Sequence, residues 1–213
     1  MIKEEIVSVV RNLTPKEDKT KRFHERFLEA IIENVLREMY TDLYKINPLL
    51  LNLYTKSYGE STAITIAQDP TTNIYYSTLP AKIINLPSKQ SGVRNIYPLV
   101  HTGNVFNPMS ADEADRLFNT DVAVVSSKIG YRTRQDTRVD YWNMNDTVLA
   151  AGVRMDLLIP FSVYSDSDVV MIPELGEKEG GDFITRVMTA LQIVPPADLQ
   201  DDNAPKEEAQ KNR

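Results

Sequence analysis

Apolar side chains recur every three or four residues in the first quarter of the chain, and this pattern predicts a long amphipathic helix over 15–45. Thr14 suits the cap, Pro15 suits the first helical position, and Glu17 can complete a capping box. The helix is expected to end before Asn47-Pro48, because the residue preceding a proline disfavours helical geometry. Its apolar stripe consists of Phe23, Phe27, Ile31, Val35, Met39 and Leu43, flanked by Leu28, Ile32, Leu36 and Tyr40.

A helix of that length spans roughly 45 Å at 1.5 Å per residue, so it is expected to overhang a compact core. Something must cover the overhanging stripe. The apolar segment IVSVVRNL at 6–13 and a helix near the C-terminus are candidates within the chain. A neighbouring copy of the protein is another, and an ordinary buried core helix is the simplest alternative.

The pattern changes after the helix to short strand-like runs separated by turn residues. Pro80, Pro87 and Pro98 interrupt these runs. Proline cannot donate to a sheet ladder, so it is confined to strand ends, edges and bulges. The expected strands lie at 49–59, 61–68, 74–79, 81–86 and 93–99, with a turn at 69–73.

Further runs predict strands at 122–127, 153–161 and 168–173, and a polar hairpin over 130–144. Ser110 and Glu113 form a second capping-box pattern, and Asp182 can cap a final helix over 182–193. Residues 195–213 are polar and lack aromatic side chains, which predicts a disordered tail.

The predicted fold class is therefore α+β. A long N-terminal helix, a small antiparallel sheet or partial barrel within 49–173, and a short C-terminal helix form one domain over 1–194, followed by the flexible tail 195–213.

Composition narrows the class of protein. The chain has 213 residues, of which 42% are hydrophobic, and this is enough for a packed core. It contains no cysteine, so disulfides and thiolate metal sites are excluded and a reducing compartment is the natural expectation. No signal peptide or membrane-spanning run is recognisable, which predicts a soluble protein. A net charge of −6 disfavours general binding to nucleic acid.

Candidate chemistry is sparse. His24 and His101 are the two histidines, and neither has a second metal-type residue at ligand spacing. The nucleophile-elbow and phosphate-loop patterns are absent. Residues 165–168 resemble half of a calcium loop but lack the required glycine and glutamate, which favours a solvated turn. We therefore expect a protein that is not an enzyme and has no cofactor or metal.

One polar cluster stands out. It contains four basic residues interleaved with one tyrosine and followed by two further aromatic residues: Lys128, Tyr131, Arg132, Arg134, Arg138, Tyr141 and Trp142. Such a hairpin can bind phosphate and stack on bases, as single-strand binders do, or it can form a protein–protein hot spot. A solvated hairpin with one core tryptophan is the third interpretation. The acidic net charge favours a protein partner, and the predicted interface residues are Arg132, Arg134, Arg138, Tyr141 and Trp142.

Three stretches carry a resemblance to a known class of proteins: IYYSTLPAKIINLPSKQSGVRNIYPL at 74–99, LLIPFSVYSDSDVVMIPELGEKEGGDFITRVMTALQ at 157–192 and PADLQDDN at 196–203. In wording and layout they resemble the head–tail adaptor, or connector ring, proteins of short-tailed bacteriophages, most closely the ring proteins of crAss-like phages. The resemblance covers most of the chain loosely, without an invariant catalytic motif. A portal-docking peptide is not evident in this sequence.

The resemblance implies a structural protein of the virion, assembled in the cytoplasm of a bacterial host. It implies a homo-oligomeric ring, commonly of twelve copies, that contacts the phage portal and other tail ring proteins and passes DNA through its lumen without specific binding or membrane contact. The tail from Pro195 is expected to become ordered only against a neighbour. The alternative function is that of a nucleic-acid-binding accessory protein that uses the hairpin from Lys128 to Arg138.

Overall fold

The computed structural model describes residues 1–13, 25–86, 92–100, 105–110, 113, 129–134, 137–173 and 182–191. Several sequence predictions lie outside these residues. They are the helix start at Thr14 to Glu17, Phe23 of the predicted stripe, Pro87, both histidines, the strand at 122–127, Lys128 and the tail 195–213.

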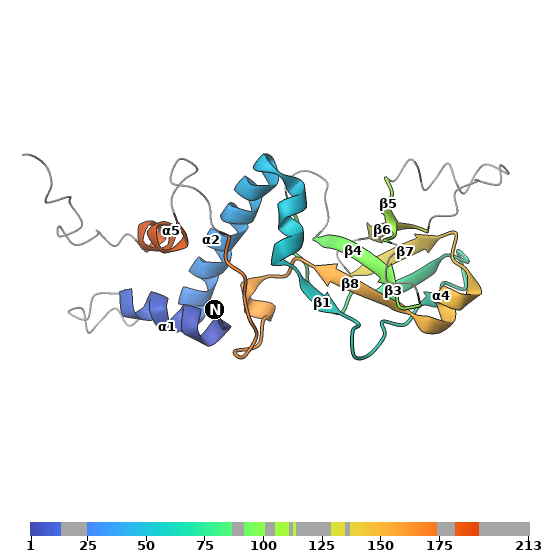
Figure 1. Cartoon of the computed structure of the whole chain (residues 1–213), viewed down its shortest axis with the longest axis horizontal. Coiled ribbons are helices and arrows are strands. Elements are labelled where there is room, and N and C mark those ends of the chain that lie inside the picture. The colour runs from blue at the N-terminus through green and yellow to red at the C-terminus, as the bar shows by residue number, and fades with distance from the viewer. Residues whose placement is uncertain are drawn as a thin grey trace, which may run out of the picture.

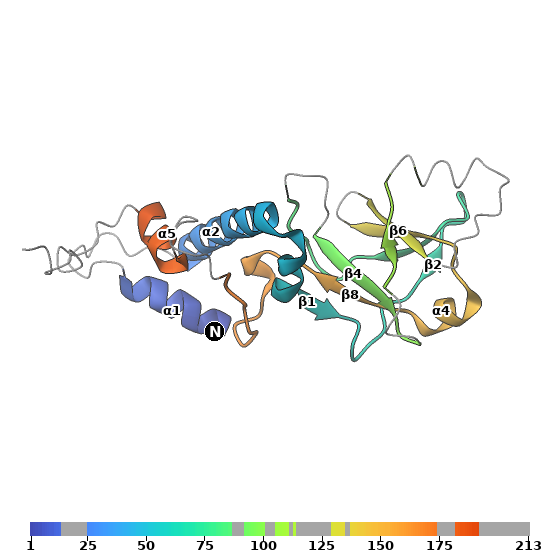
Figure 2. The same cartoon turned by 45° about the horizontal axis from the view of Figure 1, so that its top comes forward.

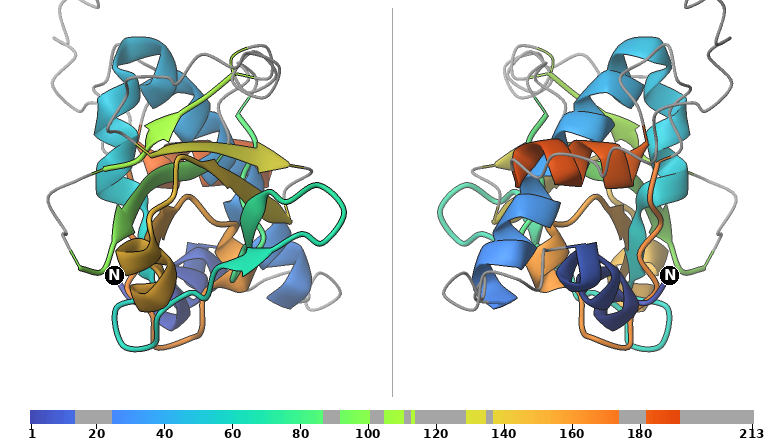
Figure 3. Two further views of the ribbon diagram at one scale, coloured as in Figure 1. Left: turned by 90° about the vertical axis from the view of Figure 1, so that its right-hand side faces the viewer. Right: turned by 90° about the vertical axis from the view of Figure 1, so that its left-hand side faces the viewer.

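Three helices gather at one end of the molecule, and the strands lie at the other end together with the short helix α4 (Asp146–Ala151) (Figures 1 and 2). The helical end contains α1 (Lys3–Leu13), α2 (Glu25–Ile46) and α5 (Phe183–Ala190). The view onto this end in Figure 3 shows α1 and α5 lying against α2, the longest of the three. None of the described helices is both long and apolar enough to cross a membrane.

The helix predicted over 15–45 is confirmed as α2, which runs from Glu25 to Ile46. The first ten residues of the prediction, 15–24, lie outside the described residues. The structure also corrects the prediction of one long N-terminal helix, because α1 is a separate helix that precedes α2. The stripe on α2 is covered within the chain by α1 and α5, as one of the sequence interpretations expected.

The buried stripe of α2 differs from the predicted row at its first turn, where Phe27 is 47% exposed. Four residues turn an α-helix by about 400°, so a row of positions spaced by four drifts around the helix by about 40° at each step. The row therefore leaves the core at its N-terminal end. The buried side chains are Leu28, Ile32, Val35, Leu36, Met39, Tyr40 and Leu43.

The first predicted strand, at 49–59, is wrong over most of its length. Residues Pro48–Tyr54 form a 3-10 helix, η1, and only Lys56–Tyr58 form a strand, β1. The reason is local, because the side chain of Asn47 accepts a hydrogen bond from the backbone nitrogen of Leu49 at 3.0 Å and Pro48 occupies the first helical position.

Two sheets replace the single small sheet of the prediction. The first has the order β1-β8-β4, with β8 at Val153–Leu157 and β4 at Val93–Pro98. The second has the order β2-β3-β7-β6-β5. All described pairs are antiparallel except β5 with β6. The second sheet consists of β2 (Ala67–Gln68), β3 (Tyr75–Thr78), β5 (Asn107–Pro108), β6 (Gly130–Arg134) and β7 (Arg138–Trp142).

Proline limits the strands as predicted. β3 ends two residues before Pro80, and Pro98 is the last residue of β4, an edge strand.

Two predicted strands do not form. The run 81–86 belongs to neither sheet, although the backbone nitrogen of Ile84 donates to Leu158 at 2.8 Å. The run 168–173 makes one bridge, between Val169 and Ile2.

Caps explain where the short helices begin. The Asp182 side chain accepts from the backbone nitrogen of Thr185 at 2.7 Å, which confirms the predicted start of α5. Ser110 and Glu113 exchange the two hydrogen bonds of a capping box, at 2.7 and 3.2 Å. A helix that the sequence analysis missed, α4 (Asp146–Ala151), is capped by Asn145.

The buried apolar side chains form one cluster that runs from the helical end into both sheets. Where the two ends meet, β8 leads into a second 3-10 helix, η2 (Phe161–Val163), which packs against α2. Lys3 of α1 is buried beside it. Its ammonium group contacts Glu29 at 2.9 Å, the Tyr164 carbonyl at 3.0 Å and the Phe161 ring at 5.6 Å, so α1 is tied to η2 as well as to α2.

Candidate partner-binding surfaces

The polar residues singled out in the sequence lie on the β6–β7 hairpin of the second sheet. The strand register places Arg132 opposite Asp140 and Arg134 opposite Arg138. Because alternate residues of a strand point to opposite faces, these four share one face of the sheet with Trp142. The structure thus brings four of the five predicted interface residues to one face.

Tyr141 departs from the prediction of an interface contact. It points to the opposite, buried face and is 1% exposed. Its hydroxyl group lies 2.5 Å from the hydroxyl of Ser77, and its ring meets Phe106 edge-on with 5.9 Å between centroids. Burial raises the pKa of the phenol. Tyr141 is therefore a core residue of the sheet, since its ring supplies apolar area and Ser77 satisfies its polar end.

On the exposed face, two of the three arginines, Arg134 and Arg138, bind carboxylates of this same chain. Asp140, only 1% exposed, accepts from Arg138 and lies 3.4 Å from the Nε atom of Arg134. Arg138 also donates to Asp69 at 2.9 Å, and its guanidinium group stacks 4.0 Å from the centre of the Tyr76 ring. The bond from Arg138 lowers the pKa of the Asp69 carboxyl, so Asp69 stays ionised.

This pairing changes the chemistry expected of the cluster. Two guanidinium groups face two carboxylates, so the surface around Arg138 is close to neutral and offers little free positive charge to a phosphate backbone. Arg132 and Trp142 are half-buried on the same face. A planar guanidinium held over an aromatic ring is a frequent contact at protein interfaces.

The buried carboxylate is also important for stability. Replacing Asp140 with alanine removes the acceptor shared by two arginines, and we expect a loss of about 2 to 3 kcal/mol in the free energy of unfolding. This expected loss is smaller than the loss for breaking a fully buried ion pair, because Arg138 still bonds to Asp69 in the variant. Urea unfolding followed by the fluorescence of the single tryptophan measures it. Arg134→Gln is the matched control with an expected loss of about 0.5 kcal/mol, because Arg134 is half exposed. Equal losses would contradict a central role for Asp140.

A second polar network, which the sequence analysis missed, covers one face of the first sheet. Asp156 on β8 is 7% exposed and accepts from Ser57 at 2.6 Å and Asn95 at 3.3 Å. Arg154 bonds Ser57 at 3.1 Å and pairs with Glu60 at 3.1 Å. The only signal in the sequence is the alternation of Arg154 and Asp156 within the apolar run 153–161. The carboxylate of Asp156 and the hydroxyl of Ser57 therefore find their partners within this network.

A third polar group lies where the first sheet meets the loop after η2. Lys56 pairs with Asp168 and lies between the rings of Tyr58 and Tyr164, 5.7 and 5.5 Å from their centres. The bond from Lys56 lowers the pKa of the Asp168 carboxyl, and burial raises the pKa of Tyr164 to about 12. The Asp168 carboxylate also accepts from the backbone nitrogen of Ser165 at 2.7 Å, which supports the interpretation of 165–168 as a turn.

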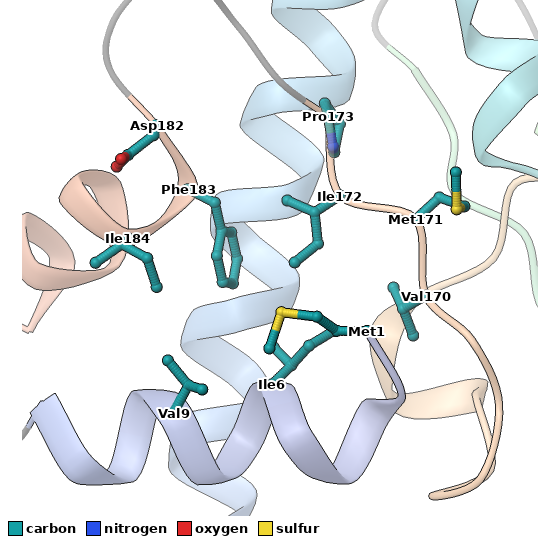
Figure 4. A pocket seen from close by; sticks show the side chains of 10 residues that line it. All are labelled: Met1, Ile6, Val9, Val170, Met171, Ile172, Pro173, Asp182, Phe183 and Ile184. Atoms are coloured by element: carbon teal, nitrogen blue, oxygen red, sulfur yellow. The ribbon is translucent and has the colours of Figure 1, made fainter.

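Apolar surface gathers at the helical end. A groove of about 430 Å³ runs between α1, α5 and the extended segment 170–173. Figure 4 shows its lining, in which Ile6 and Val9 come from α1 and Phe183 and Ile184 come from α5. Met171, also in the lining, is 53% exposed, and Asp182 is the one lining residue with a charged side chain.

A second apolar feature protrudes at the junction of α2 with η1. We call Ile46, Leu49 and Leu53 the ridge; they are 51%, 70% and 63% exposed. The sequence analysis missed it because 49–59 was predicted to be a strand. η1 is fixed beneath the ridge by fully buried Leu51 and by Arg94, which donates to the Pro48 carbonyl at 2.8 Å and to Asn52 at 3.0 Å.

The described residues contain no cluster of three or more metal-type side chains. No protein-family model matches the chain, and no curated protein matches its sequence.

Proposed function

We propose that this protein is a structural component of a phage particle, a head-to-tail adaptor whose copies form a ring between portal and tail around a DNA passage. The observation that carries the proposal is the apolar surface at the helical end. The ridge and the groove expose large aliphatic side chains on rigid elements, a pattern that marks contact with other protein chains. The sequence resemblance to connector ring proteins supplies the kind of assembly.

Electrostatics supports the same function. A net charge of −6 suits a channel wall that DNA must pass without being held. The arginines of the β6–β7 hairpin are largely offset by Asp69 and Asp140, which favours a protein partner at Arg132, Arg138 and Trp142 over the alternative of a nucleic-acid-binding accessory protein.

Labelling of native particles tests the proposal. An antibody against this chain, detected with gold in electron micrographs, is expected to mark the single vertex through which the genome leaves. Label spread over the capsid faces, or intact particles without the chain, would contradict the adaptor function.

A gel-shift assay distinguishes the adaptor function from the alternative of a nucleic-acid-binding accessory protein. With a 30-nucleotide single strand and its duplex at low salt, we expect no shift at micromolar protein. A shift that weakens steeply with salt and is lost in Arg132→Ala/Arg134→Ala would favour the nucleic-acid-binding function instead.

A further inference from the structure

We propose that the groove at the helical end receives the ridge of a second copy of this chain. The inference rests on the proposed function, because it names the contact by which neighbouring subunits of the ring would join. It assigns the groove one occupant, which is Ile46, Leu49 and Leu53 of the next subunit.

The first argument is complementary shape and polarity. The groove is concave and lined by aliphatic and aromatic side chains, and its volume lies in the range of about 300 to 1,000 Å³ that pockets use to bury a ligand. The ridge is convex and presents three aliphatic side chains, each more than half exposed. Covering exposed apolar area of this kind with another apolar surface lowers the free energy of the pair.

The second argument is charge. Lys45, beside the ridge, pairs with Asp42 at 3.1 Å, so the positive charge at the ridge comes from Arg94, whose guanidinium group bonds to two neutral acceptors, the Pro48 carbonyl and the Asn52 side chain. The groove has the opposite sign. Asp182 lines it, and Glu4 and Glu5 lie on α1, whereas the nearby Lys3 is buried. The hydrogen bond from the Thr185 backbone lowers the pKa of Asp182, so this carboxyl stays ionised. The guanidinium group of Arg94 beside the ridge and the carboxylates beside the groove have opposite charge, which favours one alignment of two copies.

The third argument is rigidity. The ridge is held by the Asn47 cap, by buried Leu51 and by the two hydrogen bonds from Arg94, so its side chains are already in position before contact. Preorganisation of this kind lowers the entropy lost on association. No ridge residue lines the groove of its own chain, so a ridge that fills the groove has to come from another copy.

The contact joins two different surfaces, so it is head-to-tail and can be repeated from copy to copy into a closed ring. Leu49 and Leu53 are the expected centre of the interface on one side, and Val9 and Met171 on the other.

Self-association of the full chain tests the contact. Sedimentation at concentrations up to about 100 μM is expected to show species larger than two chains. Leu49→Asn/Leu53→Asn on the ridge and Val9→Gln/Met171→Gln in the groove are each expected to weaken self-association at least about tenfold. All four side chains are exposed, so the fold should remain intact, which circular dichroism checks. Val100→Asn/Val105→Asn, at exposed positions outside both surfaces, is the matched control and should associate normally.

Mixing the two variants gives the sharpest result. The mixture retains one intact ridge and one intact groove, so it should form a complex of two chains and nothing larger, whereas each variant alone stays monomeric. Association of either variant at the unmodified level, a mixture that stays monomeric, or an unmodified chain that is monomeric throughout would overturn this contact. Gold label at the genome-exit vertex would still stand in that case, so failure of the contact and failure of the adaptor function are distinguishable.

Discussion

Truncating Phe161 to alanine is expected to lower the free energy of unfolding by about 3 to 5 kcal/mol, the usual cost of removing a buried aromatic ring. Phe161 is 1% exposed and begins η2, where the chain passes from β8 to the helical end. Its ring also lies 5.6 Å from the ammonium group of Lys3, which holds α1. The loss should therefore reach both ends of the molecule.

Two optical probes check this prediction during urea unfolding. Far-UV circular dichroism follows the helices, and the fluorescence of Trp142 follows the second sheet. If residues 1–194 form one domain, both curves should shift together to lower urea and still coincide. Ser162→Ala is the matched control, because Ser162 is exposed and its hydroxyl donates to Glu33 at 2.7 Å. We expect a loss below about 1 kcal/mol. Curves that separate would contradict a single cooperative domain.

Replacing Gly152 with alanine is expected to cost about 3 kcal/mol or more. Gly152 has φ 79° and ψ −172°, a backbone region that is essentially restricted to glycine. A Cβ atom there would also lie 2.8 Å from the Ile64 carbonyl oxygen, which is backbone and cannot move aside without shifting the bridge between Ile64 and Val153. Strain and overpacking therefore add at the start of β8.

Gly130→Ala is the matched control for this prediction. The atoms nearest to a Cβ at Gly130 belong to the flexible side chain of Met109, which can rotate away. We expect a loss of about 1 kcal/mol or less for this variant in the same urea assay. Equal losses for the two glycines would show that the backbone of Gly152 is not the constraint.

Features that depend on near neighbours in sequence were predictable. The end of α2 at Ile46, the Asp182 cap of α5 and the Ser110–Glu113 capping box each follow from two or three adjacent side chains that satisfy the backbone locally. The same logic accounts for the errors. The caps at Asn47 and Asn145 are equally local, and a search for caps within 47–55 and 145–152 would have found η1 and α4.

The candidate surfaces were less predictable. The sequence shows Arg132, Arg134 and Arg138 as a cluster. It does not show that Asp69 and Asp140 pair with Arg134 and Arg138, because Asp69 comes from a turn that lies 69 residues before Arg138. Tyr141 and Trp142 are adjacent in sequence, and only the strand register sends the first into the core and leaves the second half-buried.

By itself, the sequence determined the mixed helix and strand content, the positions of the caps and prolines, and the apolar stripe of α2, since these depend on periodicity and on bonds between near neighbours. Only the tertiary structure decided that the strands divide into two sheets, that the hairpin arginines are offset by carboxylates, and that Leu49 and Leu53 protrude. Those outcomes depend on which distant segments pack together, because burial and charge pairing are properties of the space around a side chain and not of its neighbours along the chain.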